Sequence, residues 1–470
     1  MHVFWHRRDL RAPDNRGLAR AAARGPVCPV FVFDESVLAH AAPPRVAFLL
    51  DALASLRAWY RERGGDLHVA HGDPSAVLPE LAAALDAEAV HWNDDYSGLA
   101  RERDRAVTAA LEADGVAVDA AGDALLHEPG SITPNEGDHY SVFSYFWTKW
   151  RDREKADPVE APPADALVAD AAAGAADPLP SLADLSVAEP ACSVPAAGTA
   201  AARERLAAFL DGPVYDYEER RDYPADECTS RLSPHLRFGT VGVREVYAAT
   251  ARAMAAAPDA DARSSVESFR RQLAWREFYA HVLRFDPRVV AANVRDYAEP
   301  IEWRSDPAGL QAWRDGETGY PLVDAGMRQL RREGHVHNRV RMVVASFLTK
   351  DLLVDWRRGY EWFRERLVDH DPANDSGGWQ WAASTGADAQ PYFRVFNPTT
   401  QCERYDPDAE YVREYVPELR EATPDQVHDW PSLSPADRER VAPDYPAPIV
   451  DHAARREQAI DAFERARGED

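Results

Sequence analysis

The first 122 residues alternate short apolar runs with segments of helical periodicity, and this pattern constrains the fold more than any other feature. Between the second and third runs, apolar residues recur every three or four positions from Val46 to Leu56, which predicts a helix packed on a sheet. Strand–helix–strand repeats form parallel sheets with helices on both faces. We therefore expect an α/β region with a doubly wound, parallel five-stranded sheet. Its strands are predicted at residues 3–5, 30–33, 67–69, 89–92 and 116–118.

The remainder of the chain has a different character. Residues 156–198 contain no aromatic residue, Lys or Arg and are rich in Pro, Ala and Asp, a composition typical of a linker. After residue 200 the segments become long and amphipathic, with helix starts predicted at Ser233, which precedes a proline, and at Ser264, which opens a capping box. We expect an α/β domain over 1–125, an interdomain linker over 126–200 and an all-helical domain over 201–470.

The composition limits which binding partners and which cellular compartment we expect. Asp and Glu total 79 against 54 Lys and Arg, and a net charge of -25 usually argues against nucleic acid as a partner. However, only three of the cations are lysines, which is typical of adaptation to a very salty cytoplasm, so the charge reflects the solvent. The widely spaced cysteines indicate neither a disulfide framework nor a metal site, and no signal peptide or apolar run of about 18 residues is present. We expect a cytoplasmic protein with no metal and no membrane partner.

Two segments of the helical region combine polar and aromatic groups in ways that allow two interpretations. Gln272, Trp275, Arg276 and Tyr279 share one helix face, either as a polar network between helices or as a binding surface. Residues 229–234 bring three hydroxyls to a helix start, where free backbone N–H groups attract phosphate or are simply capped.

A second helix contains Arg341 among Val, Ala, Phe and Leu side chains. A buried arginine without a partner would cost several kcal/mol, so Arg341 needs a carboxylate, and Asp369 and Asp371 are candidates. Downstream, Trp379 and Trp381 lie one residue apart behind a pair of glycines, in a cluster of indoles and aspartates. This part of the chain predicts a site that combines redox-capable and hydrogen-bonding groups.

Six motifs stand along the chain in one order. They are residues 5–11 with 14–15, 229–234, 275–279, 319–321 with 324–328, 338–342 and 378–381. In this order they resemble the photolyase and cryptochrome family, and only the linker is unmatched. The resemblance implies an antenna chromophore in the N-terminal domain and a U-shaped FAD in the helical domain. It further implies that excited, reduced FAD passes an electron to a flipped-out pyrimidine dimer, whose cyclobutane ring splits before the electron returns.

The resemblance also assigns roles to individual residues. Those implied to bind FAD are Tyr217, Thr229, Ser230, Arg231, Leu232, Ser233, Gln272, Arg276, Asn338, Arg341, Asp369, Asp371 and Asp375. Within this set, Arg341 and Asp369 form an ion pair against the flavin, and Asp371 accepts the hydrogen of the flavin imide. Those implied to contact DNA or its lesion are Arg221, Gln272, Trp275, Arg276, Asn338, Arg339, Met342, Trp381 and Arg394. We expect these arginines to form one basic face.

The catalytic set implied by the resemblance comprises a tryptophan relay and one aspartate. Trp379, Trp356 and Trp303 match the family's relay, which reduces oxidised flavin from the protein surface. Asp375 stands where photolyases typically have Asn and plant cryptochromes have Asp, so it favours a cryptochrome-type photoreceptor as the alternative function. Signalling cryptochromes usually extend well beyond the helical domain, and we expect no effector tail here.

Three further positions bear on the lesion and the antenna. Gln272 replaces the Glu usual in bacterial dimer photolyases and is typical of the six-four lineage, whereas Asn338 and Met342 are of the cyclobutane type. Ala100 stands where folate-binding members carry Glu, so we favour a deazaflavin antenna over folate. We therefore expect a monomeric cyclobutane pyrimidine dimer photolyase acting on UV-damaged DNA, with a photoreceptor or a six-four photolyase as alternatives.

Overall fold

The computed structural model describes residues 1–168 and 178–468, which form two compact units. The first unit contains the sheet and, besides residues 1–190, includes residues 194–218 and 230–287; the second comprises 191–193, 219–229 and 288–470. The expected domain boundaries near residues 125 and 200 stay a prediction. Residues 169–177 of the expected linker and the last two residues of the expected helical domain lie outside the described residues.

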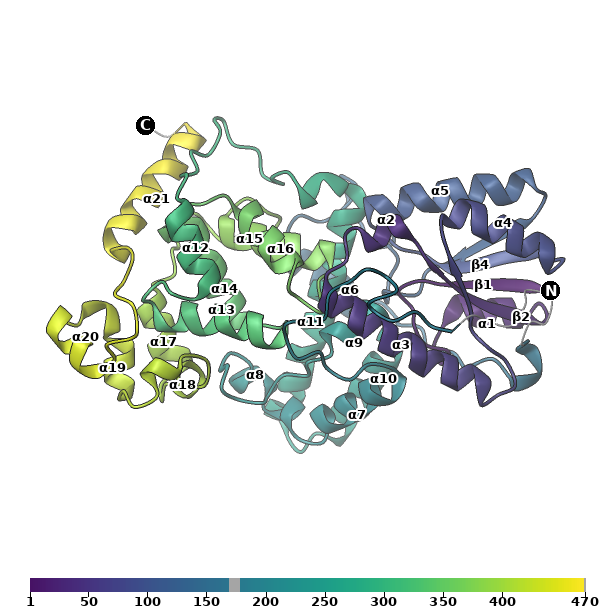
Figure 1. The fold of residues 1–470 in the computed structure, drawn as a ribbon, viewed down its shortest axis with the longest axis horizontal. Helices are drawn as coiled ribbons and strands as arrows, with labels where there is room; N and C mark the ends of the chain where they lie inside the picture. The colour runs from purple at the N-terminus through teal and green to yellow at the C-terminus, as the bar shows by residue number, and fades with distance from the viewer. Residues whose placement is uncertain (169–177, 469–470) are drawn as a thin grey trace. The chain divides into compact units, whose positions relative to one another are not determined.

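The predicted five-stranded parallel sheet is confirmed in the first unit (Figure 1). Its strands run in the spatial order β3-β2-β1-β4-β5, and all four pairings are parallel. The strands are β1 (His2–His6), β2 (Val27–Phe33), β3 (His68–His71), β4 (Ala89–Asn93) and β5 (Ala117–Ala121). The three central strands are buried along their whole length, because helices cover both faces of the sheet.

Four helices of the first unit cover the two faces of this sheet (Figure 1). Helices α4 and α5 cover one face, where Val3 and Trp5 point into the core, and α1 and α3 lie on the other, where His6 Nε2 is 2.8 Å from the Tyr60 hydroxyl. The helices are α1 (Arg16–Ala22), α2 (Glu35–Leu38), α3 (Pro43–Arg61), α4 (Pro74–Ala84), α5 (Gly98–Ala113), α6 (Phe143–Asp152), α7 (Thr199–Leu210), α9 (Ser233–Phe238), α10 (Val243–Ala256) and α11 (Ala260–Phe285). The short α8 (Tyr217–Arg220) spans a border between the units.

The two predicted helix starts differ in outcome. Helix α9 begins at Ser233, as predicted, but Ser233 is its first residue rather than its cap: Leu232 holds the cap position, and no side chain accepts a hydrogen bond there. The start predicted at Ser264 is wrong, because α11 begins at Ala260 and its cap is Asp259, whose side chain accepts the N–H of Ala262. An aspartate at this position satisfies a free N–H as well as a serine does, so local pattern does not separate the two candidates.

A cluster of buried ions ties the sheet to α10 in the first unit. The Asp123 carboxylate receives the guanidinium groups of Arg11 and Arg244, each at 2.5 Å, and the backbone N–H of Arg16 at 3.0 Å. The Arg244 Nε also donates to Asp14 at 2.7 Å. Burial alone would raise the pKa of Asp123, but the two arginines hold it below its usual value. All four charged side chains are at most 3% exposed, so they form one compensated ionic group.

The second unit is helical (Figure 1). It holds a large apolar core. Its helices are α12 (Pro307–Asp315), α13 (Pro321–Glu333), α14 (Asn338–Ser346), the π-helix η4 (Phe347–Asp351), α15 (Trp356–Arg364), α16 (Pro372–Ala383), α17 (Pro398–Tyr405), α18 (Glu410–Tyr415), α19 (Pro424–His428), α20 (Pro435–Val441) and α21 (His452–Arg467). Among the described helices of both units, none combines the length and apolar character that crossing a bilayer requires.

Close packing of α15 on α16 depends on Gly359. A Cβ at this position would lie 2.1 Å from the Trp379 ring and 2.6 Å from Leu348, so Gly359→Ala must displace one of them. We expect a loss of about 1–3 kcal/mol in the free energy of unfolding, measured by denaturant titration of the purified holoprotein. Gly378→Ala is the matched control, because a Cβ there meets no atom within 4 Å, and it should stabilise the helix slightly. Equal stabilities of the two variants would contradict this packing.

Candidate functional site

The ion pair between Arg341 and Asp369 is the centre of the candidate site in the second unit. An Arg341 terminal nitrogen lies 3.1 and 2.9 Å from the two Asp369 oxygens, and its Nε donates to the Val336 carbonyl at 2.8 Å. The Asp369 side chain is 5% exposed and the Arg341 side chain 22%. The carboxylate partner predicted for Arg341 is therefore confirmed as Asp369, and part of the Arg341 side chain stays exposed.

Asp371 immediately precedes α16 and caps it. Its Oδ1 accepts the backbone N–H groups of Ala373 and Asn374, each at 3.1 Å, and the side-chain amide of Asn374 at 2.9 Å. This use of one oxygen fixes the orientation of the carboxylate at the helix start. The implied contact of Asp371 with the flavin imide stays a prediction, and it would be made by a rigidly held group.

Asp375, one turn into α16, contacts a histidine that the sequence interpretation missed. The His370 Nδ1 lies 2.6 Å from Asp375 Oδ2, and an Arg341 terminal nitrogen lies 3.7 Å from Asp375 Oδ1. Asp375 thus joins the Arg341–Asp369 pair in one charged group. The five-residue spacing between His370 and Asp375 crosses a helix start, so helical periodicity gives no signal for the contact.

Three of the residues expected at the lesion, Asn338, Met342 and Trp381, lie on α14 and α16 of the same unit. Asn338 is exposed and its amide lies 3.8 Å from the Met342 sulfur, four residues along α14. Trp381 is half-buried and tilted against Phe396, with ring centroids 6.3 Å apart. The side chains of this set are partly accessible to a ligand, while their contacts with a lesion stay a prediction.

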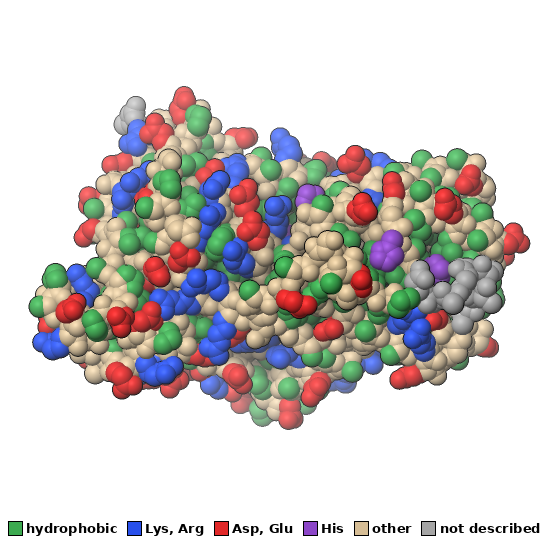
Figure 2. Space-filling model, in the orientation of Figure 1, with side chains coloured by type: hydrophobic (Ala, Val, Ile, Leu, Met, Phe, Trp, Pro, Cys, Tyr) green, Lys and Arg blue, Asp and Glu red, His purple; other side chains and the backbone are tan. Residues whose placement is uncertain are grey.

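The arginines expected to meet DNA are held to different degrees. Arg339 donates to Asp222 at 2.7 Å and lies 4.3 Å from the centre of the Tyr405 ring, Arg221 is half-buried, and Arg394 is exposed. On the face drawn in Figure 2, Lys and Arg side chains gather over α13 and α14 with acidic side chains among them. A single basic face stays a prediction.

The three tryptophans of the expected relay all belong to the second unit. Trp379 on α16 and Trp356 at the start of α15 are buried, whereas Trp303 is half-buried and contacts Phe463 edge to face at 5.9 Å. Within residues 1–168 and 178–468, no direct ring contact joins Trp379 to Trp356 or Trp356 to Trp303. Trp303 is therefore the most exposed of the three, and the relay stays a prediction.

Trp379 contacts two aromatic residues that the sequence interpretation did not single out. Its ring meets Trp313 at 6.0 Å and Phe363 at 5.2 Å, both edge to face. The indole N–H of Trp313 donates to the Val344 carbonyl at 3.0 Å, which fixes that ring in the core. Trp313 and Phe363 occupy helix positions typical of the apolar core, so the sequence gives no signal that either residue contacts Trp379.

The polar face predicted on α11 exists in the first unit, but its members are largely tied to the protein. Gln272 donates to the Ser268 carbonyl, and the Trp275 ring stacks on Phe143 with centroids 3.6 Å apart. One face of Trp275 is therefore already covered. Its stacking on a dimer stays a prediction and would use the other face.

Arg276 donates to two backbone carbonyls, those of Ala124 at 2.8 Å and Leu236 at 3.2 Å. Next to it, burial raises the pKa of Glu277 to about 8, although the N–H groups of Leu126 and His127 both donate to this carboxylate. The α11 face thus acts as a structural network as well as a candidate binding surface. The contacts of Arg276 with FAD and DNA stay predictions.

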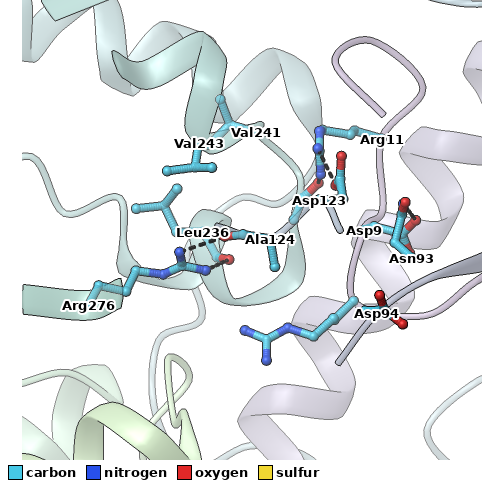
Figure 3. A pocket seen from close by; sticks show the side chains of 12 residues that line it. Asp9, Arg11, Asn93, Asp94, Asp123, Ala124, Leu236, Val241, Val243 and Arg276 are labelled. Atoms are coloured by element: carbon cyan, nitrogen blue, oxygen red, sulfur yellow. Dashed lines mark hydrogen bonds and ion pairs between the residues drawn. The ribbon is translucent and has the colours of Figure 1, made fainter. Parts of the chain in front are cut away.

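A small cavity of the first unit lies beside Arg276 (Figure 3). Its volume is about 10 Å³, enough for about one water molecule. Its polar lining residues are Arg8, Asp9, Arg11, Asn93, Asp94, Asp123 and Arg276. Burial raises the pKa of Asp94. This cavity is too small for an antenna chromophore.

Along the chain, the division between the second and the first unit falls within the hydroxyl-rich motif at residues 229–234, after Thr229. Ser230 Oγ accepts the N–H of Leu232 at 3.4 Å, and Arg231 has a positive φ of 47°. Tyr217 is buried against Phe209 and Phe269. Thr229, Ser230 and the exposed Ser233 keep accessible surface, and their contact with the FAD diphosphate stays a prediction.

The chain matches sequence families and proteins along nearly its whole length. Residues 2–164 match the DNA photolyase family, and residues 269–465 match the FAD binding domain of DNA photolyase. The chain is 63% identical to the deoxyribodipyrimidine photo-lyase of Halobacterium salinarum, with 100% of both chains covered. A halophilic relative agrees with the acidic, lysine-poor composition.

Solved structures agree with these matches. A bacterial class III photolyase from Agrobacterium tumefaciens superposes with a TM-score of 0.90 at 36% identity, covering 99% of this chain and 98% of the other. An archaeal photolyase from Sulfolobus tokodaii, which contains two FAD molecules, superposes with a TM-score of 0.84 at 32% identity, covering 99% of both chains. The chain belongs to the DNA photolyase family.

Proposed function

We propose that the chain repairs cyclobutane pyrimidine dimers in UV-damaged DNA, with FAD as its cofactor and light as its energy source. The observation that carries the proposal is the charged group of Arg341, Asp369 and Asp375, which lies in the region that matches the FAD binding domain of DNA photolyase. Full-length identity of 63% to a deoxyribodipyrimidine photo-lyase supports the reaction.

The chemistry of these side chains suits a flavin. The ring system of a flavin presents carbonyl oxygens and ring nitrogens, which need both donors and acceptors, and Arg341 and Asp371 supply one of each. Both side chains are held by further hydrogen bonds, so little rotamer entropy is lost when a ligand binds. When bound and reduced, FAD supplies the light-driven electron; the protein residues bind it, orient it and compensate its charge.

The lesion side of the proposal rests on Asn338, Met342 and Trp381. An amide can donate to the carbonyl oxygens of a thymine, and a thioether and an indole offer adaptable apolar contact. A flipped-out base is typically held by these two kinds of contact. We assign the cyclobutane dimer rather than the six-four product because Asn338 and Met342 are of the cyclobutane type.

The proposal also covers the antenna chromophore and the oligomeric state. We retain a deazaflavin over folate as the second chromophore, on the basis of Ala100. In the Sulfolobus photolyase, two FAD molecules imply a novel light-harvesting cofactor, which makes a second flavin the principal competitor. We also propose that the protein acts as a monomer in a high-salt cytoplasm. Extraction and chromatographic identification of the bound chromophores tests the antenna directly.

Repair can be tested with purified protein, fully reduced FAD and an oligonucleotide that contains one thymine dimer. Blue light should restore the ultraviolet absorbance of the thymines, while a dark sample and an oligonucleotide with a six-four product should remain unchanged. No restoration with fully reduced FAD would refute the proposed function. Repair of the six-four product alone would reassign the lesion.

A further inference from the structure

His370 and Asp375 form a close pair beside the Arg341–Asp369 ion pair. The Asp375 Oδ2 accepts from two groups, the His370 Nδ1 at 2.6 Å and the backbone N–H of Asp371 at 3.2 Å. The other oxygen, Oδ1, is turned toward Arg341 at 3.7 Å. The side chains of His370 and Asp375 are 8% and 10% exposed, so solvent screens their interaction only weakly.

The donors around Asp375 determine where the proton of the pair belongs. An imidazole, an amide N–H and a guanidinium all face this carboxylate, so the carboxylate acts as an acceptor and Nδ1 of His370 carries the hydrogen. Asp375 in this structure is therefore not an isolated acid. Any proton that leaves or enters this group involves His370.

The net charge of Arg341, Asp369 and Asp375 also bears on proton binding at this site. With both carboxylates ionised, Asp369 and Asp375 exceed the single charge of Arg341, and a buried excess charge is costly. An electron added at this site would raise the excess further, which favours the uptake of a proton at the same time. The other titratable groups facing this site are His335, whose Nδ1 lies 3.9 Å from Asp369, the capping Asp371 and, from α15, Tyr360, whose ring meets His370 edge to face at 5.6 Å.

We propose that His370 is a positioning residue of the flavin site: it fixes the Asp375 carboxylate with Oδ1 toward Arg341, and the pair sets how flavin reduction depends on pH. The inference rests on the proposed function, because it takes the Arg341 group to face FAD. When reduction adds one electron from an external reductant, the pair takes up one proton from water at the imidazole. The charge of the proton cancels that of the added electron, so the net charge of the site does not change. The only bond formed in the protein is the N–H bond on the imidazole.

The test is the midpoint potential of bound FAD as a function of pH, measured in holoprotein by redox titration. His370→Phe removes the hydrogen bond but keeps a ring against Tyr360, and Asp375→Asn removes the carboxylate. Each should change the pH profile in the same way, and the double variant should change it no further. His370→Gln can still donate to Asp375 but does not titrate, so it should preserve FAD binding while flattening the profile.

His428→Phe is the matched control, since it replaces a buried histidine of the second unit that contacts the Asp406 carbonyl and is not part of this charged group, and its profile should follow that of the parent protein. A His370→Phe profile that overlays the parent, or effects of the two single variants that add, would overturn the inference. If His370→Phe fails to fold, the flat profile of His370→Gln decides alone. Absence of dimer repair by parent protein with bound FAD would refute the proposed function, while the profiles would still decide the role of His370.

Discussion

Asp123→Ala should be among the most destabilising single substitutions in the first unit, with a loss of about 3–5 kcal/mol in the free energy of unfolding. The substitution removes the carboxylate between Arg11 and Arg244, both of which are at most 3% exposed. Each guanidinium would then lose its shortest ionic contact while remaining buried. Denaturant unfolding of the purified holoprotein, followed by tryptophan fluorescence, measures the loss.

The matched control is Asp152→Ala, which breaks an Asp–Arg pair of similar length at the surface. Asp152 and its partner Arg151 are 62% and 50% exposed and lie 2.8 Å apart, so water and salt screen the pair. Its loss should cost at most about 1 kcal/mol. If both variants lost the same small amount, the cluster around Asp123 would be solvated rather than buried, contrary to the structure.

The buried ion cluster also marks a limit of sequence interpretation. The strands and the helix start at Ser233 could be predicted because apolar periodicity and a proline in the first turn of a helix are local signals. In the sequence, Arg11 and Asp14 stand out only as parts of a family motif, and Arg244 and Asp123 give no signal at all. Their contacts join residues more than 100 positions apart, as with Arg244 and Asp123. Local pattern carries no information on such pairing.

The candidate site was predictable to a similar degree. The need for a carboxylate beside Arg341 follows from the cost of an unpaired buried charge, and Asp369 meets that need. In the sequence, His370 is only the residue between two aspartates. From its residue type alone, Asp375, the partner of His370, is interpreted as a protonatable group that favours a photoreceptor. The contact at 2.6 Å changes that interpretation, because the hydrogen-bonded neighbours of a carboxylate determine its behaviour.

Trp379→Phe should nearly abolish light-driven reduction of oxidised FAD while leaving repair by chemically reduced FAD intact. Trp379 lies one helical turn after Asp375 on α16, so we propose it as the relay tryptophan nearest in sequence to the charged group proposed to face the flavin. Phenylalanine preserves the edge-to-face contact with Phe363 but is far harder to oxidise than an indole. Illumination of oxidised holoprotein with an external reductant, followed by the flavin absorption spectrum, measures the reduction rate.

Trp313→Phe separates the electron relay from packing. Trp313 is as deeply buried as Trp379 and touches it at 6.0 Å, but its indole N–H is bound to the Val344 carbonyl in the apolar core. Because both variants remove one buried indole, their stabilities should fall by similar amounts, whereas only Trp379→Phe should lose photoreduction. Equal loss of photoreduction in both would show that the two indoles donate as one unit. Undiminished photoreduction in Trp379→Phe would remove this residue from the relay, and the search for the first donor would then move to Trp313 and its neighbours.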